Sequence, residues 1–113
     1  MGYKSQAVGT VPVTFVTTPE HSRTRPTGIK IYNADGADRI ITGTDVFIPD
    51  ASEGESSPSE QTEQFLKVSV GSALTADIPR TELEDCKLLG TVKFAADGIT
   101  ADSPVVSLFY DVA

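Results

Sequence analysis

The chain has 113 residues, 39% of them hydrophobic and 22% charged, which is the length of one domain and the composition of a folded protein. An intrinsically disordered chain and a two-domain protein are therefore excluded, and we expect a single domain over residues 1–113. The net charge is −7, and residues 50–113 alone contribute −8, from twelve acids and four bases. Such a surface repels phosphate, so neither nucleic acid nor a lipid membrane is expected as a partner.

Cysteine and histidine each occur once, as Cys86 and His21. One cysteine cannot form an intramolecular disulfide, and no Cys and His set with metal spacing exists, so a disulfide framework and a structural zinc are excluded. No pattern supports Cys86 and His21 as a nucleophile and its base. We expect a solvated histidine, a partly buried cysteine, no cofactor and no enzymatic activity. The first residues contain no run of seven apolar side chains, so neither a signal peptide nor a membrane span is expected.

The first part of the chain is predicted to be extended. Residues 1–10 are expected to form an N-terminal arm. The stretch "TVPVTFVTT" over residues 10–18 follows as a strand, because Val11, Val13 and Phe15 alternate with polar residues. Pro12 indicates an edge strand, since proline cannot donate a hydrogen bond to a ladder.

The stretch "TPEHSRTRPTG" over residues 18–28 predicts a basic, semi-rigid loop. Arg23 and Arg25 are two residues apart and point the same way in an extended segment. Two interpretations of this arginine pair remain open. They form a solvated face or a weak ion pair with Glu20, or they contact the acidic stretch of another subunit.

Two strands follow, separated by a turn. "GIKIYNADG" over residues 28–36 alternates Ile29 and Ile31 and ends in Asn33, Asp35 and Gly36, which suit a tight turn. "RIITGTDVFIP" over residues 39–49 predicts a strand with a bend or bulge at Gly43.

The oxygen-rich turn "YNADGAD" invites a comparison with a calcium-binding loop. When Gly36 is aligned with the sixth position of such a loop, Ile31 takes the first position and Thr42 the last. Both positions need a carboxylate, so the motif fails. The turn "AADG" over residues 95–98 fails in the same way, with Lys93 first. We expect both segments to be β-turns.

Residues 50–64, "DASEGESSPSEQTEQ", contain five carboxylates, four serines and no base. They cannot contribute to a hydrophobic core, so we expect a solvated acidic loop. Three further strands are predicted after it, over residues 64–74, 88–98 and 103–112. The last is the candidate for the central strand, because both of its faces are apolar.

One segment, "PRTELEDCKLLG" over residues 79–90, admits a short helix of about residues 81–88. Thr81 and Glu84 have the spacing of a capping box, and Gly90 suits a helix end. The competing interpretation is a loop between strands, in which Leu83 alone is anchored inward. Together the segments predict an all-β fold: an antiparallel β-sandwich or a jelly-roll-like barrel with at most this one helix.

A faint repeat links "IKIYNADGAD" and "VKFAADGITAD", each a strand, an Ala-Asp-Gly turn and Ala-Asp. Two copies of one hairpin unit suit a sandwich with two equivalent corners, and chance in a sequence rich in Ala and Asp is the alternative explanation of the match. Asp97 and Asp102 remain a candidate pair of calcium ligands, although they do not belong to a calcium-loop motif.

In style the chain resembles the small β-rich structural proteins of tailed bacteriophage virions, such as capsid decoration and head-to-tail or tail-associated proteins. The resemblance is carried by the start "MGYKSQAVGTVPVTFVTT", the turns "NADGAD" and "AADGITADS", the lone cysteine and the closing strand "VVSLFYDVA". It implies a non-enzymatic virion component, assembled in the host cytoplasm, that binds copies of itself and other virion proteins of a capsid or tail lattice.

The residues expected at such interfaces come from the arm, the first strand and the two charged loops: Tyr3, Lys4, Val11, Val13, Phe15, Arg23, Arg25, Glu53, Glu55 and Glu60. In this interpretation residues 3–16 lie on a neighbouring copy, by strand addition or by packing in a groove. The alternative function is a β-sandwich module that binds a protein or a carbohydrate. Carbohydrate modules present aromatic platforms, and without tryptophan only Tyr3, Tyr32 and Tyr110 are candidates, which disfavours a sugar platform.

Overall fold

The computed structural model describes residues 2–19, 22–47, 60–83, 88–99 and 102–112. Within these ranges the chain forms eight β-strands and one short 3-10 helix, η1. The elements are β1 (Gly2–Ala7), β2 (Val13–Thr17), β3 (Thr24–Tyr32), β4 (Arg39–Phe47), β5 (Gln61–Val70), β6 (Thr75–Ile78), η1 (Arg80–Glu82), β7 (Thr91–Ala96) and β8 (Val105–Val112).

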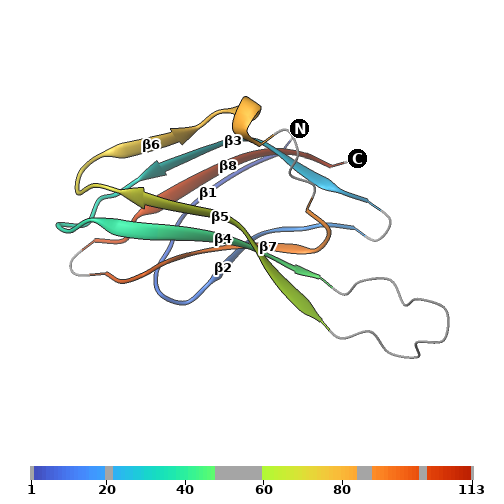
Figure 1. The fold of residues 1–113 in the computed structure, drawn as a ribbon, viewed down its shortest axis with the longest axis horizontal. Coiled ribbons are helices and arrows are strands. Elements are labelled where there is room, and N and C mark those ends of the chain that lie inside the picture. Colours follow the sequence, from blue (N-terminus) through green and yellow to red (C-terminus); the bar gives the residue numbers. More distant parts are fainter. Residues whose placement is uncertain (1, 20–21, 48–59, 84–87, 100–101, 113) are drawn as a thin grey trace.

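The strands form two four-stranded sheets that face each other (Figure 1). Sheet A has the strand order β1-β8-β3-β6, and sheet B has the order β2-β7-β4-β5. Every strand pair is antiparallel. The all-β antiparallel sandwich predicted from the alternation of apolar residues is therefore confirmed.

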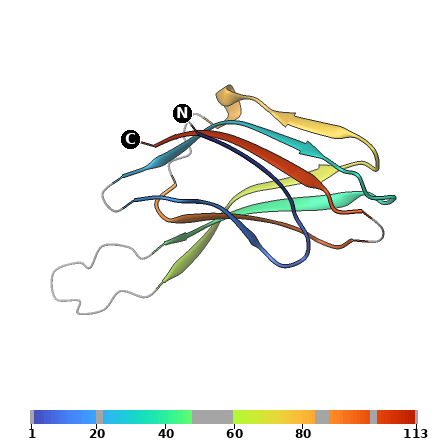
Figure 2. The same ribbon diagram turned by 180° about the vertical axis from the view of Figure 1, so that it is seen from behind.

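The strand pairs are nested around the connection between β4 and β5. β4 pairs with β5, β3 with β6, β2 with β7, and β1 with β8, so the second half of the chain runs back along the first. Figure 2 shows the outermost pair, β1 and β8, side by side in sheet A. Pairs between β3 and β8 and between β4 and β7 join the two halves of each sheet.

The hydrophobic core lies between the sheets. Its completely buried large side chains are Ile29, Ile31, Ile41, Val92, Phe94, Val106 and Leu108. Phe94 is the aromatic centre of a mainly aliphatic layer, because the rings of Phe15 and Phe65 pack edge-on against it at centroid distances of 4.8 and 5.8 Å. Such edge-to-face pairs add to the stabilisation from buried apolar area.

Several local predictions are confirmed. β8 is a central strand of sheet A, and β2, which follows Pro12, is an edge strand of sheet B. The register between β4 and β5 shifts between Gly43 and Thr44, so the predicted irregularity lies at the glycine. The outward side chains of β8 are only half-buried, since the sheets cover each other on one face only.

The strand expected over residues 64–74 ends at Val70, and a separate strand, β6, begins at Thr75 after a turn. β5 begins at Gln61, so residues 61–64 belong to a strand and the acidic loop predicted over 50–64 ends earlier. After Val70 the chain turns, with Ala73 at φ 59°, and it enters the other sheet as β6. The alternation of apolar residues continues to Leu74, but the hydrogen bonds of Ala73 and Leu74 with Asn33 end the strand before it.

In the described part of the segment expected to be a helix over residues 81–88, the structure has a single 3-10 turn, η1. η1 begins after Pro79, and no side chain caps it, so Thr81 does not act as an N-cap. Leu83 is buried, as the loop interpretation required, and Leu88 returns to the sheet through a bridge to Thr24. Residues 84–87 lie outside the described ranges, together with Cys86.

The segment predicted as an arm is a strand of the chain's own sheet. β1 pairs with β8 along its whole length, from Gly2 opposite Tyr110 to Ala7 opposite Val105. Val8, which follows, is buried, and its N–H donates to the carbonyl of Pro104 at 2.8 Å. The apolar strand β8 needs a partner on this side, and the first residues of the same chain supply it.

Candidate functional site

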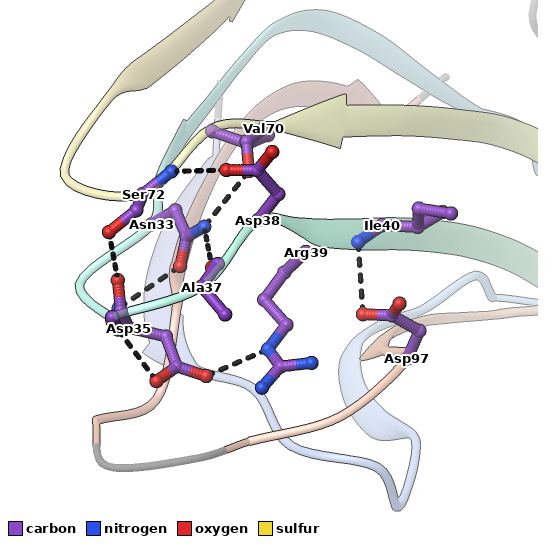
Figure 3. A network of polar contacts seen from close by, with 10 residues as sticks. Asn33, Asp35, Ala37, Asp38, Arg39, Ile40, Val70, Ser72 and Asp97 are labelled. Carbon is purple, nitrogen blue, oxygen red and sulfur yellow. Dashed lines mark hydrogen bonds and ion pairs between the residues drawn. The ribbon is translucent and has the colours of Figure 1, made fainter.

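Asn33 joins two turns at one end of the sandwich (Figure 3). It is completely buried, and its side-chain amide donates to the carbonyls of Ala37 and Val70, both at 2.9 Å. Its side-chain oxygen accepts the N–H of Asp35 at 3.0 Å. All the side-chain hydrogen bonds of Asn33 therefore stabilise the connections after β3 and β5.

Asp35 and Arg39 form a buried ion pair beside Asn33. Nε of Arg39 lies 2.7 Å from Oδ2 of Asp35, and the two side chains are 16% and 0% exposed. Oδ1 of Asp35 accepts the N–H of Gly36 at 2.8 Å. The hydroxyl of Ser72 donates to the backbone carbonyl of Asp35, and its N–H donates to Asp38. The oxygens considered as calcium ligands are thus engaged by donors of the chain.

The two turns of the faint sequence repeat lie next to each other (Figure 3). Asp97 follows β7, and its carboxylate accepts the N–H of Ile40 at 3.0 Å. The N–H of Asp97 in turn donates to the carbonyl of Ile40. A side chain at Gly98 would meet the guanidinium of Arg39 at 2.9 Å, so glycine leaves the space that Arg39 occupies. Asp102, the other candidate calcium ligand, is exposed.

Asp45 is a buried carboxylate that the sequence analysis did not single out. It is 4% exposed, and its two oxygens accept the N–H groups of Leu89 and Gly90 at 2.8 and 2.9 Å. A side chain at Gly90 would collide with the backbone of β4, so glycine permits this approach. The sequence contained a signal for this burial, because Asp45 continues the alternation of inward positions that begins with Ile41 and Gly43.

The residues predicted for an interface differ in exposure within the described part of the chain. Phe15 is 5% exposed and belongs to the core, and Val13 is half-buried against it, so neither presents an open apolar side chain to a partner. Both were chosen as one face of a strand, and that face points inward. Lys4 faces inward opposite Leu108, and its Nζ donates to the carbonyl of Thr14 at 3.4 Å, which links the edge strands β1 and β2.

The other predicted interface residues remain accessible. Tyr3 and Val11 are 58% and 75% exposed. Arg23 and Arg25 are exposed, and Arg25 lies opposite Asp111 in the register of β3 and β8. Glu60 is exposed just before β5. Glu53 and Glu55 lie outside the described residues, as does His21.

The outward surface of sheet A carries two of the three tyrosines. Residues opposite each other in antiparallel strands point to the same side, and Val106 and Leu108 point inward, so their neighbours in β8 point outward. The outward residues form three rows that run across the strands of sheet A, and we call this surface the tyrosine face. The first row is Tyr3, Phe109 and Gly28, and the second is Ser5, Ser107, Lys30 and Asp77. The third row is Ala7, Val105, Tyr32 and Thr75. Tyr110, the third tyrosine, packs against the core.

Comparisons with protein families, with curated proteins and with solved structures give no match. None of the helical segments in the described part of the chain is long and apolar enough to cross a membrane. Within the described residues, no group of three or more His, Cys, Asp or Glu side chains is arranged to hold a metal ion.

Proposed function

We propose that the chain is a non-enzymatic structural protein of a tailed-bacteriophage virion, a capsid-decoration or head-to-tail or tail-associated component. It acts by binding copies of itself and other virion proteins. The polar side chains buried in the described part of the chain are all hydrogen-bonded within it, at strand connections. Its accessible features include edge strands and charged loops, which are means of association.

The nested strand pairing is the observation that carries the proposal. Eight strands in two sheets, with the first paired to the last and each next pair inside it, support a jelly-roll arrangement. Viral capsid domains and lectins are the typical users of that arrangement. This connectivity and the resemblance of the sequence to small virion proteins support the same role.

Edge strands supply the contacts between copies. β5 has ten residues and, among the described strands, lies at the edge of sheet B beside β4. An edge strand of this length can accept a strand from another chain. The start of β3, which Arg23 precedes, lies at the same end of the molecule as the start of β5 (Figures 1 and 2). We propose that Arg23 and Arg25 contact the acidic stretch of a neighbouring copy at this end.

Sedimentation velocity tests the association. We expect the purified chain to sediment as an oligomer at high concentration and the oligomer to weaken as salt is raised, because salt screens contacts between exposed charges. Arg23→Glu should weaken it further. Lys93→Glu is the matched control, since it makes the same change of charge on a half-buried strand position in sheet B.

Two results would count against this proposal. A chain that stays monomeric at every concentration and salt level excludes self-association. If Arg23→Glu and Lys93→Glu weaken the association equally, then the association depends on net charge and Arg23 makes no specific contact.

A further inference from the structure

The tyrosine face has the chemistry of a site for an uncharged ligand. Its charged members lie opposite partners of the other sign, Lys30 opposite Asp77 and Arg25 opposite Asp111 at its margin. The face is therefore neutral on a chain of net charge −7. A nucleic acid requires excess positive charge, and an acidic or basic peptide requires excess charge of the opposite sign, so neither fits.

Aromatic rings form the two ends of the face. Tyr3 is 58% exposed, and its ring lies 4.8 Å from that of Phe109, tilted by 43°. Gly28 lies on the other side of Phe109 and has no side chain to cover this half-buried ring. Tyr32 is 46% exposed and stands two rows away. Exposed rings of this kind present apolar faces together with hydroxyl groups.

Small polar side chains fill the row between the rings. The hydroxyls of Ser5 and Ser107 lie 2.9 Å apart, and Lys30 and Asp77 continue the same row across the sheet. The serine hydroxyls both donate and accept hydrogen bonds, the ammonium group of Lys30 donates them, and the carboxylate of Asp77 accepts them. From Tyr3 to Tyr32 the strand spacings give a diagonal of about 16 Å, which suits a short chain of rings better than a single ring.

We propose that the tyrosine face binds a neutral oligosaccharide. Sugar rings have apolar C–H faces that stack on aromatic rings and hydroxyl groups that exchange hydrogen bonds with a polar row. The arrangement of two exposed tyrosines, one half-buried phenylalanine and a hydrogen-bonding row matches both requirements. This site is independent of the assembly proposed above, because it uses a sheet face and the assembly uses edges and loops.

The test is a titration with defined neutral hexasaccharides of glucose, mannose and N-acetylglucosamine, followed by tyrosine fluorescence and by backbone NMR. A sulfated hexasaccharide is the charged comparison. We expect a neutral probe to bind, to shift the amide signals of β1, β3 and β8, and to be insensitive to salt. Tyr3→Ala and Tyr32→Ala should each weaken binding roughly ten-fold, as expected for the loss of one stacking ring.

Two controls separate the ring contacts from changes in the fold. Tyr3→Phe keeps the ring and should bind nearly as well as the parent chain. Val11→Ala removes an apolar side chain that is 75% exposed but lies off the face, and it should bind equally well. Circular dichroism checks that each variant is folded.

Three outcomes would overturn the proposal. In the first, no neutral probe binds or only the sulfated one does. In the second, Tyr3→Ala and Tyr32→Ala bind as well as Val11→Ala. In the third, the tyrosine variants change only the sedimentation of the chain, which would make the face an interface between copies. Loss of assembly with sugar binding intact would instead count against the proposed structural role alone.

Discussion

We expect Arg39→Met to lower the free energy of unfolding by about 3–5 kcal/mol, because breaking a buried ion pair from one side leaves a buried charge without its counter-ion. The remaining group would be Asp35, whose side chain is completely buried. Methionine has a similar length and preserves much of the packing of the arginine stem. Urea denaturation measures the change.

Arg25→Met is the matched control for this variant. Arg25 is exposed on β3, where an ion pair contributes at most about 1 kcal/mol. The double variant Arg39→Met/Asp35→Asn should recover part of the lost stability, because it removes the buried charge as well. If Arg39→Met lowers the free energy of unfolding no more than Arg25→Met does, the ion pair of Asp35 and Arg39 does not stabilise the turn after β3.

Asp45→Ala is expected to lower the free energy of unfolding by about 1–3 kcal/mol, since it removes the buried carboxylate that accepts the N–H groups of Leu89 and Gly90. Asp45→Asn keeps one side-chain oxygen as an acceptor and should lower the free energy of unfolding less than Asp45→Ala does. Asp77→Ala, an exposed carboxylate on the edge strand β6, is the control and should change stability by no more than about 0.5 kcal/mol.

Thermal unfolding followed by circular dichroism ranks these three variants. The expected order of destabilisation is Asp45→Ala, then Asp45→Asn, then Asp77→Ala. Equal melting temperatures for Asp45→Ala and Asp77→Ala would mean that the two backbone donors find water in the folded protein and that Asp45 has no structural role.

Most strands were predictable because each is a local pattern. In β8 the inward residues Val106 and Leu108 alternate with Val105 and Ser107, and this alternation is visible without knowledge of any neighbour. The bend at Gly43 was predictable for the same reason. The all-β class followed from such patterns alone.

Pairing partners were not predictable from local patterns. The first strand was interpreted as an arm because Gly2–Ala7 has no continuous apolar face. Only the position of β8, about a hundred residues later, makes it part of a sheet. β6 was missed because four residues between a turn and a proline carry too little alternation to be distinguished from the preceding strand.

The candidate sites show the same division. Asn33 and Asp35 were recognised as turn residues, but their buried bonds to Val70 and Arg39 depend on the packing of distant turns. Tyr3 and Tyr32 were noted as isolated tyrosines, and only the register of β1, β8 and β3 places them on one face with Phe109. Phe15 was assigned to an interface because the sequence shows that a strand has an apolar face but not which way it points.

The central claim is that the chain works by association through its exposed edges, and NMR over a wide range of protein concentration tests it most directly. We predict that amide signals of the edge strands β1 and β5 shift and broaden as concentration rises, while those of Ile29, Ile41 and Leu108 in the core remain unchanged. A spectrum that stays constant from low micromolar to near-millimolar protein, with the narrow lines of a monomer, would contradict the account.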